Sequence, residues 1–181
     1  IPKPLYKINN LPIIDYLINT FTFFPNIDIL TVVGHQKNEI IKHIQGRSFH
    51  VFQEVQNGTG GAVKVCLEFI DRYENIFIFM GDAPFIGKNN VKQMILSHMS
   101  ANADCSFLYS NFPFNLPYAR LFFDKDKNLE RLTEFCDLNN RDKDVDSFFT
   151  SHYLCKSKFL LNEIENLGLN SVTGECNLTE I

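Results

Sequence analysis

Short runs of apolar, β-branched residues alternate with amphipathic segments along the first two thirds of this chain. The apolar runs have the length and composition of strands, and they lie at residues 28–34, 49–54, 75–84 and 103–111. The amphipathic segments have helical spacing, and they lie at residues 11–21, 37–46, 62–73 and 88–102. This alternation predicts βαβ units. We therefore expect an α/β fold with a doubly wound, mostly parallel sheet that is covered on both faces.

The pattern changes after residue 111. Residues 117–135 are typical of two strands joined by a turn at 124–128, and residues 147–167 of a strand followed by a helix. We expect an inserted hairpin that forms a capping region. By analogy with other α/β folds, such a region often lies on the side where the substrate binds. Because the chain opens without a methionine at "IPKPL" and stops at "NLTEI", we expect residues 1–181 to be one domain that is incomplete at both ends.

The charge and the cysteine content restrict the classes of partner and the cellular compartment that we expect for this protein. The formal net charge is −4 and the lysines and arginines are scattered. Binding a phosphate backbone needs clustered cations, so we expect no nucleic-acid partner. No apolar run reaches the roughly 20 residues of a membrane span. The five cysteines are widely spaced and form no CxxC pair, which favours reduced thiols in a cytoplasmic protein over a zinc site.

Asp82 follows Gly81 at the end of an otherwise uncharged apolar run, two residues before Pro84. In doubly wound sheets, ligands bind beyond the carboxyl ends of the strands, so this carboxylate is expected to project into the ligand crevice. There it would hold Mg²⁺, a cation that takes one or two protein carboxylates together with substrate phosphates. The alternative is a helix N-cap or a turn aspartate.

The segment "QEVQNGTGG" joins a predicted strand to a predicted helix and holds three glycines in the four residues from Gly58 to Gly61. Exposed backbone N–H groups would suit an anion or a ligand that approaches the bare backbone closely. The alternative is a turn that needs positive φ. The loop matches neither GxGxxG nor GxxxxGK(S/T). Gln53 and Gln56 add amide groups that suit a nucleobase edge or a sugar hydroxyl.

Several further residues have both a functional and an ordinary interpretation. Lys3 lies between two prolines, whose rigidity could aim its ammonium group, although a solvated lysine fits the same pattern. Arg120 could bind a phosphate through two parallel hydrogen bonds or could form a structural ion pair. His35 could act in catalysis or could simply be a polar residue at the end of a strand. The other histidines show no metal-ligand spacing: His43, His50, His98 and His152.

Together these residues favour catalysis by electrostatics. The sequence shows no nucleophile elbow and no pairing of a cysteine with a histidine. It does predict a metal-binding carboxylate, a cation and a backbone loop. Such a set suits phosphoryl or nucleotidyl transfer, in which positioning and charge stabilisation carry most of the catalysis.

A series of stretches covers almost the whole chain in an order typical of a known family. These stretches are "PKPLYKINNLPIIDYLI", "TVVGH", "FQEVQNGTGGAV", "FIFMGDAPFI", "PYARL", "LTEFCDL" and "GECNLTEI". In that order they resemble the sugar-nucleotide pyrophosphorylases, and above all the uridyltransferase domain of the bacterial bifunctional N-acetylglucosamine-1-phosphate uridyltransferase/glucosamine-1-phosphate acetyltransferase. The resemblance implies a Rossmann-like nucleotidyltransferase fold. It also implies a Mg²⁺-dependent transfer of UMP from UTP to N-acetylglucosamine 1-phosphate, with release of pyrophosphate.

The resemblance implies roles for individual residues. Lys3 would be a catalytic residue that neutralises phosphate charge, and Asp82 would be both catalytic and the Mg²⁺ ligand. Gln53, Gly58 and Thr59 would contact the uracil. The positions that would contact the sugar are Ala119, Glu134 and Thr150.

The sequence departs from the family pattern in several places. The family's first glycine-rich loop, of the LAAGxGTRM type, and its second metal ligand do not lie within the sequence. "GKP" is replaced by "NLP" at residues 10–12, "GYGR" by "PYAR" at residues 117–120, and "NTG" or "NSG" by "TSH" at residues 150–152. A histidine in place of that last glycine could crowd the sugar pocket, so the uracil side matches the family better than the sugar side does.

Two alternatives stand beside this uridyltransferase. One is a nucleotidyltransferase that uses a different sugar or alcohol phosphate, or CTP in place of UTP. The other is a catalytically weak nucleotide- or sugar-binding domain. The partners that we expect are UTP and a sugar 1-phosphate, and a homo-oligomer could form through a C-terminal part beyond Ile181.

Overall fold

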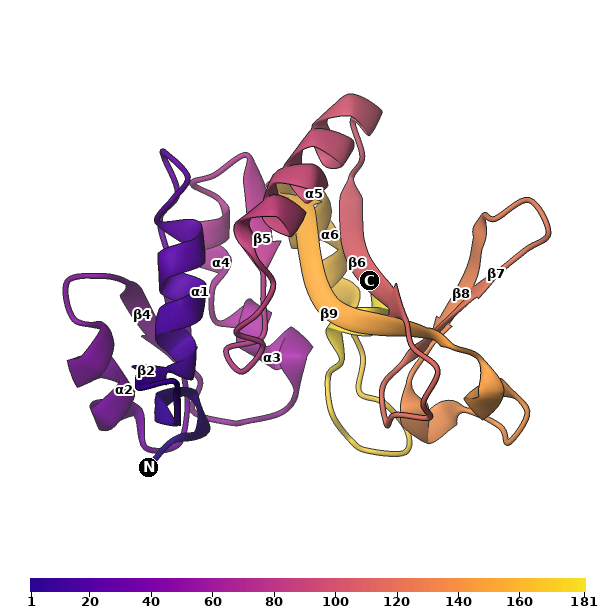
Figure 1. Ribbon diagram of the computed structural model, residues 1–181, viewed down its shortest axis with the longest axis horizontal. Coiled ribbons are helices and arrows are strands. Elements are labelled where there is room, and N and C mark those ends of the chain that lie inside the picture. The colour runs from indigo at the N-terminus through magenta and orange to yellow at the C-terminus, as the bar shows by residue number, and fades with distance from the viewer.

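The computed structural model describes every residue from Ile1 to Ile181 (Figure 1). Its N-terminal half is organised around a parallel pair of strands, β3 (Leu30–Val33) and β4 (Phe49–Phe52). Helix α2 (Lys37–Ile44) connects these two strands, and helix α1 (Ile13–Phe21) precedes them and lies on the same side of the molecule. The strand–helix–strand unit predicted from the alternating pattern is therefore present.

Strand β9 (Ser147–Lys156) is the strand on which the second sheet is built. It pairs antiparallel with β5 (Asn75–Ile78), with β6 (Cys105–Asn111) and with β7 (Arg120–Phe123). Strand β7 pairs in turn with β8 (Leu129–Thr133), and this hairpin projects from the body of the molecule at the end opposite to the N-terminus (Figure 1). Because β5 and β6 are both antiparallel to β9, they run parallel to each other.

Helices cover the second sheet. Helix α5 (Lys88–Ala101) connects β5 to β6, and helix α6 (Ser157–Asn166) follows β9 directly (Figure 1). Between β4 and β5 the chain forms two short helices, α3 (Thr59–Lys64) and α4 (Leu67–Ile70). None of the helices combines the length and the apolar character that a membrane crossing needs.

Short elements complete the chain. At the N-terminus a 3-10 turn, η1 (Lys3–Leu5), is followed by a two-residue hairpin of β1 (Lys7–Ile8) and β2 (Leu11–Pro12). The remaining 3-10 turns lie in the second half of the chain: η2 (Phe135–Asp137), η3 (Asp142–Asp144) and η4 (Leu178–Glu180).

Of the three apolar clusters that hold these layers together, two contain five or more buried residues. The larger one packs α3, α4 and α6 against β7 and β9, with Leu121, Leu160 and Ile164 fully buried. The smaller one packs α1 and α2 against β3 and includes Val33 and Ile44. Burial of apolar surface is the main favourable term in folding, so these clusters explain why the amphipathic segments form helices here.

The α/β fold class is confirmed, with differences in detail. The strand predicted at the start of residues 147–167 is β9, which runs through the middle of the second sheet and makes the pairs of that sheet antiparallel, where a mostly parallel sheet was expected. The single helix predicted over residues 62–73 begins earlier, at Thr59, and is broken into two at Val65 and Cys66. The predicted hairpin over 117–135 is present.

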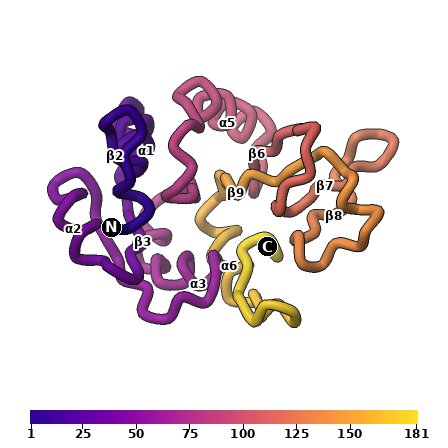
Figure 2. Tube along the Cα trace, turned by 60° about the horizontal axis from the view of Figure 1, so that its bottom comes forward, coloured from indigo at the N-terminus to yellow at the C-terminus, as the bar shows by residue number.

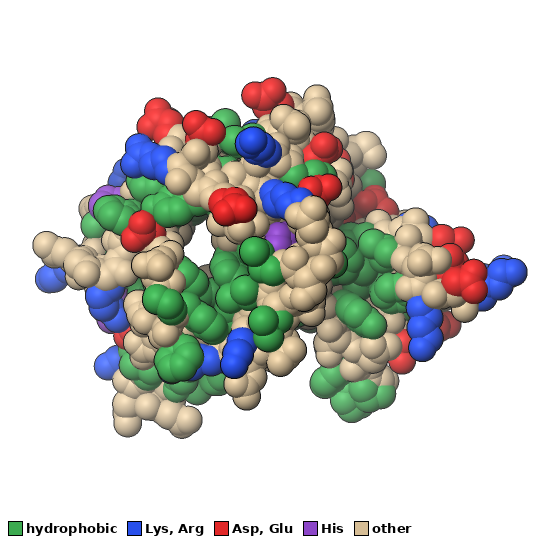
Figure 3. Space-filling model, turned by 90° about the horizontal axis from the view of Figure 1, so that it is seen from above, with side chains coloured by type: hydrophobic (Ala, Val, Ile, Leu, Met, Phe, Trp, Pro, Cys, Tyr) green, Lys and Arg blue, Asp and Glu red, His purple; other side chains and the backbone are tan.

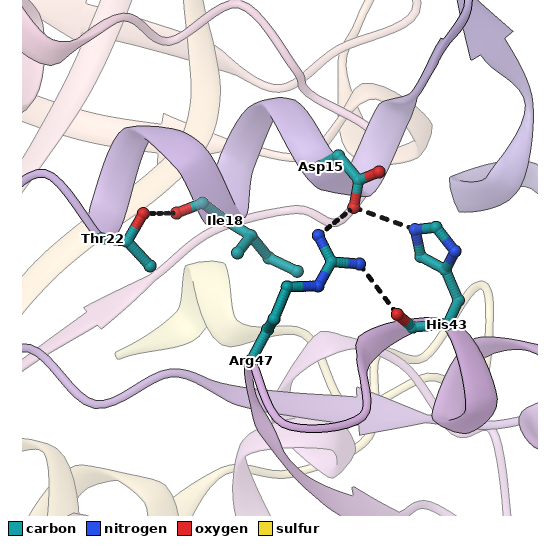
Figure 4. A network of polar contacts seen from close by, with 5 residues as sticks. All are labelled: Asp15, Ile18, Thr22, His43 and Arg47. Carbon is teal, nitrogen blue, oxygen red and sulfur yellow. Dashed lines mark hydrogen bonds and ion pairs between the residues drawn. The ribbon is translucent and has the colours of Figure 1, made fainter.

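A buried carboxylate ties α1 to the end of α2 (Figure 4). Asp15 on α1 is 6 % exposed, and its Oδ1 accepts a hydrogen bond from Nη1 of Arg47 at 2.7 Å. The same oxygen lies 2.9 Å from Nε2 of His43, and Arg47 also donates to the carbonyl oxygen of His43. A carboxylate this deeply buried is stable only when its oxygens are paired, and the arrangement fixes the angle between the two helices.

We predict that Asp15→Ala lowers the free energy of unfolding by about 1–3 kcal/mol, because it removes the oxygen that Nη1 of Arg47 and the ring of His43 contact. Asp15→Asn keeps an acceptor oxygen but removes the charge, so its loss is expected to be smaller. The measurement is chemical denaturation followed by circular dichroism. Asp126→Ala, in the exposed turn of the hairpin, is the control and should change stability by less than about 0.5 kcal/mol. Equal stability of all three variants would contradict the role given to Asp15.

Candidate functional site

Lys3 and Asp82 meet at the carboxyl end of β5, although 79 positions separate them in the sequence. Nζ of Lys3 donates to Oδ2 of Asp82 at 2.5 Å. Lys3 begins the 3-10 turn η1 between two prolines, and Asp82 lies four residues beyond the last residue of β5. The two side chains stay open to solvent, with exposed fractions of 67 % for Lys3 and 41 % for Asp82. A ligand can therefore reach both the cation and the carboxylate of this pair. Acidic and basic side chains lie close together on the face of the molecule that Figure 3 shows.

The charges of this pair act on each other. The hydrogen bond and the negative charge of Asp82 raise the pKa of the Lys3 ammonium group. Tyr118, in the segment before β7, lies near enough to interact with Lys3 through its charge when it is ionised. A lysine with a raised pKa stays charged at neutral pH, and is suited to bind an anionic group such as a phosphate.

The donor set at this point fits a magnesium ion that takes most of its ligands from a substrate. Nowhere in the structure do three or more histidine, cysteine or acidic side chains gather in a metal-binding cluster, so no all-protein cage is formed. Asp82 offers one exposed carboxylate. Mg²⁺ is commonly held by one or two carboxylates together with substrate phosphates and water, and Asp82 meets that requirement.

The C-terminal segment closes over the glycine-rich loop (Figure 2). The amide of Cys176 donates to the carbonyl oxygen of Asn57 at 2.7 Å, and the amide of Gly60 donates to the carbonyl oxygen of Cys176 at 2.8 Å. The amide of Leu178 donates to Oγ1 of Thr59 at 2.9 Å. Several polar groups of the loop are therefore used within the protein, and the loop is shaped by a segment more than 110 residues away in the sequence.

Glycine is required at position 58 for two reasons. Its φ is +99°, a region that side chains rarely adopt. A Cβ atom there would also come within 2.5 Å of the carbonyl oxygen of Cys176. The loop is thus a positive-φ turn with a close backbone approach, and the segment that approaches it here belongs to the chain itself.

The two glutamines lie on different sides of this loop. Gln53 is buried, and its Nε2 donates to Oδ1 of Asn57 at 3.2 Å and to the carbonyl oxygen of Gly58 at 3.3 Å. Gln56 is exposed, and its amide lies over Gly34, where a Cβ atom would meet Nε2 at 2.1 Å. Gln53 therefore stabilises the loop, whereas Gln56 points to the ends of β3 and β4.

A polar groove of about 730 Å³ opens at the carboxyl ends of β3 and β4. Its walls come from the start of α2 and from the segment after β4. They include Gly34, His35, Glu54 and Gln56. His35 is exposed in this groove, and no hydrogen-bonding partner gives it the geometry of a catalytic base. The groove lies where an α/β sheet of this kind binds ligands.

The residues predicted to contact a sugar are all engaged within the protein. Ala119 is buried in the larger apolar cluster, and its carbonyl oxygen accepts from the amide of Phe149 at 3.0 Å. Oε1 of Glu134 accepts from the hydroxyl of Thr179 at 2.5 Å. The hydroxyl of Thr150 donates to the carbonyl oxygen of Leu108 at 2.7 Å. Their contact with a sugar stays a prediction.

Arg120 forms neither of the contacts considered from its sequence context. It is fully buried, and its guanidinium group donates to the carbonyl oxygens of Leu116, Tyr118 and Val145 and to the side chain of Asn115. Burial lowers its pKa. Because it has no acidic partner and no access to solvent, its function is to hold the segment before β7 in place.

The fold and this site define a nucleotidyltransferase domain. The model of the family described as "MobA-like NTP transferase domain" matches residues 2–171, and the chain belongs to that family. Among curated proteins, the bifunctional protein GlmU of Thermosipho melanesiensis is 30 % identical over 181 residues and that of Thermoanaerobacter pseudethanolicus 27 % identical over 179 residues. Each alignment covers 99 % of this chain and 39 % of the relative. The chain thus spans about two fifths of the length of these proteins.

Solved structures share the fold. A UDP-glucose pyrophosphorylase in complex with UDP-glucose aligns with a TM-score of 0.77 over 99 % of this chain and 76 % of its own, at 15 % identity. A Bacillus anthracis protein assigned as a glucose-1-phosphate thymidylyltransferase, in complex with sucrose, aligns with a TM-score of 0.78 over 98 % of this chain and 71 % of its own, at 14 % identity. At these identities the comparison establishes the fold, and the Rossmann-like nucleotidyltransferase expectation is confirmed.

We predict that Gly58→Ala lowers the free energy of unfolding by about 1–3 kcal/mol, because alanine is strained at positive φ and its Cβ would push the C-terminal segment away. Gly168→Ala is the matched control, since Gly168 has no positive φ and no neighbouring atom would lie within 4 Å of an added Cβ. Urea denaturation of the two variants measures the difference. A Gly58→Ala protein as stable as the control would show that the close approach is not needed.

Proposed function

We propose that this domain catalyses the Mg²⁺-dependent transfer of UMP from UTP to N-acetylglucosamine 1-phosphate, which gives UDP-N-acetylglucosamine and pyrophosphate. The observation that carries the proposal is the exposed Lys3–Asp82 pair at the carboxyl end of β5. Membership of the NTP transferase family and the order of the sequence motifs support the reaction type. The similarity to GlmU proteins supports this choice of substrates.

The reaction needs little covalent chemistry from the protein. An oxygen of the sugar 1-phosphate attacks the α-phosphorus of UTP, a new P–O bond forms, and the bond from the α-phosphorus to the bridging oxygen breaks. The electron pair of that bond leaves with pyrophosphate. Lys3 would bind and neutralise phosphate oxygens, because its ammonium group is charged and open to solvent. Asp82 would hold Mg²⁺, which when bound neutralises part of the triphosphate charge.

The glycine-rich loop would bind the nucleobase. Gln53 keeps the loop in shape by donating to Asn57 and Gly58, and Gln56 presents a free amide at its exposed edge. The hydroxyl of Thr59 accepts a hydrogen bond from Leu178 but donates to no acceptor within the protein, so its proton is available to a uracil carbonyl oxygen.

The sugar would bind on the other side of the Lys3–Asp82 pair. Tyr118 lies near the pair on that side. Ala119 directly precedes β7, Glu134 directly follows β8, and Thr150 lies within β9. Glu134 keeps one carboxylate oxygen free of the Thr179 contact, and a carboxylate is a strong acceptor for a sugar hydroxyl or amide.

A second candidate is transfer to a different sugar 1-phosphate or from a different nucleoside triphosphate. His152 favours this candidate, because the family that the sequence resembles has glycine at the corresponding position. A side chain there would change the shape of the region where the sugar is proposed to bind. A third possibility is a catalytically weak nucleotide- or sugar-binding domain. Such a domain would bind its ligand through the glycine-rich loop but would release little or no pyrophosphate.

The decisive measurement is pyrophosphate release by the full-length protein. UTP, CTP, GTP, ATP and dTTP are each combined with a panel of sugar 1-phosphates in the presence of Mg²⁺. We expect the highest kcat/KM for UTP with N-acetylglucosamine 1-phosphate. Preference for another pair would establish the second candidate, and binding without turnover for every pair would establish the third.

We predict that Asp82→Asn lowers kcat by about 100-fold or more at saturating Mg²⁺, because the amide keeps the shape but removes the charge that holds the metal. The effect should be larger at limiting Mg²⁺, and steady-state pyrophosphate release at several Mg²⁺ concentrations measures it. Asp126→Asn, an exposed aspartate in the hairpin turn, is the control for a change of net charge. Unchanged kcat and unchanged Mg²⁺ dependence in Asp82→Asn would show that the metal assignment is wrong.

A further inference from the structure

Strand β9 has a gap on one of its two edges. Strand β6 pairs along one edge from Ser147 to Cys155, so β5 and β7 must share the other edge. On that edge β5 pairs with residues 153–156 and β7 with Phe148. Residues 150–152 therefore lie between the end of β5 and the start of β7, and no strand covers them there.

The same residues form a bulge in β9. Phe107 of β6 is paired with Tyr153, and Tyr109 is paired with Phe149. Three residues of β9, from Thr150 to His152, therefore face the single residue Leu108. Bulges of this kind re-aim side chains and are frequent beside active sites.

The backbone of the bulge is strained. Ser151 has a φ of +56°, which is uncommon for a residue other than glycine and unexpected within a strand. Such conformations persist only where the surrounding structure holds them, and they gather at ligand-binding sites. The residue that follows this strained position is His152, and its side chain is buried.

His152 is buried without a hydrogen-bonding partner. It is 6 % exposed, and neither Nδ1 nor Nε2 has a partner within the protein. His98, the other buried histidine, shows the usual solution, since its Nδ1 lies 2.9 Å from the hydroxyl of Ser106 and its Nε2 lies 3.2 Å from Oδ1 of Asn75. Buried polar groups are nearly always paired, so the ring of His152 is an exception, and a ligand or an ordered water would supply the partners that it lacks within the chain.

The surroundings of His152 place it beside the Lys3–Asp82 pair. Its ring packs edge-on against Phe79, with 4.8 Å between the ring centroids, and Phe79 directly follows β5. Burial lowers the pKa of the imidazole, whereas a close contact with the backbone of Thr150, outside the hydrogen-bonding geometry, and the charge of Asp82 act in the other direction. The ring is therefore neutral at pH 7, with one N–H donor and one nitrogen acceptor.

We propose that His152 is a specificity-determining residue that hydrogen-bonds to the sugar ring of the bound sugar 1-phosphate, through a neighbouring donor and acceptor on that ring. The proposal rests on the proposed function, because it takes the acceptor substrate to lie between the ends of β5 and β7. Two adjacent hydroxyl groups, or one acetamido group, offer both a donor and an acceptor. A phosphate group offers acceptors only and would leave one ring nitrogen unpaired, so the partner is the sugar and not its phosphate.

The test compares His152→Phe with wild type in the full-length protein. Phenylalanine keeps a planar ring of similar size but has no polar atom. We expect KM for the sugar 1-phosphate to rise about tenfold while KM for the nucleoside triphosphate stays unchanged. We also expect Tm to rise by about 2–4 °C, because an unpaired buried polar group is removed. A merely structural histidine would not give greater stability together with weaker binding of one substrate.

Two further variants sharpen the result. His152→Gln restores a donor and an acceptor, so its KM for the sugar 1-phosphate should lie between the values of wild type and His152→Phe. His98→Phe, the matched control, removes a fully paired buried histidine, so Tm should fall and the two KM values should keep their ratio. With deoxy analogues of the sugar 1-phosphate, wild type should discriminate against at least one analogue and His152→Phe should lose that discrimination.

The outcomes separate this proposal from the proposed function. If His152→Phe is more stable but binds every sugar 1-phosphate as wild type does, the ring is paired with buried water and the proposal is overturned. If wild type turns over no pair of substrates, the proposed function fails. Calorimetric titration with sugar 1-phosphates then tests His152 by itself, and equal affinity of wild type and His152→Phe would overturn the proposal in that case too.

Discussion

The hydrogen bonds along β9 are the interactions on which the rest of this structure depends. This ten-residue strand pairs with β5, β6 and β7, and these strands come from both halves of the chain. Its apolar side chains form the centre of the larger core, where α6 packs against them. Because one strand joins β5, which leads to Asp82, to the β7–β8 hairpin, any change in its register would move these two parts of the molecule relative to each other.

The regular pairing of β9 stops at one place, and that place adjoins the chemistry. Between its pairs with β5 and β7, the strand bulges, Ser151 takes a positive φ, and His152 turns inward without a partner. The nearby end of β5 leads to Asp82, which meets Lys3. The two ends of this strand are thus paired and packed, whereas its middle retains strain and two ring nitrogens without hydrogen-bonding partners in the chain.

Much of the fold could be predicted from local pattern, and the exceptions have physical reasons. Period-two and helical spacing located β3, α2, β4, α5 and the β7–β8 hairpin, because burial of one face imposes that spacing on the sequence. The pattern could not show that β9 lies in the middle of the sheet, since strand order depends on pairing between distant segments. It also predicted one helix where α3 and α4 form, because the short break at Val65 leaves the apolar spacing nearly intact.

The sequence by itself determined the α/β class and the position of Asp82 at a strand end. Each of these follows from local preferences of the backbone or from the polarity of neighbouring residues. Only the tertiary structure decided that Lys3 reaches Asp82, that Cys176 closes over the loop, and that Arg120 is held by carbonyl oxygens. It also decided that both nitrogens of His152 are buried and unpaired. Contacts between distant residues depend on how the whole chain packs, and no local pattern of residues encodes them.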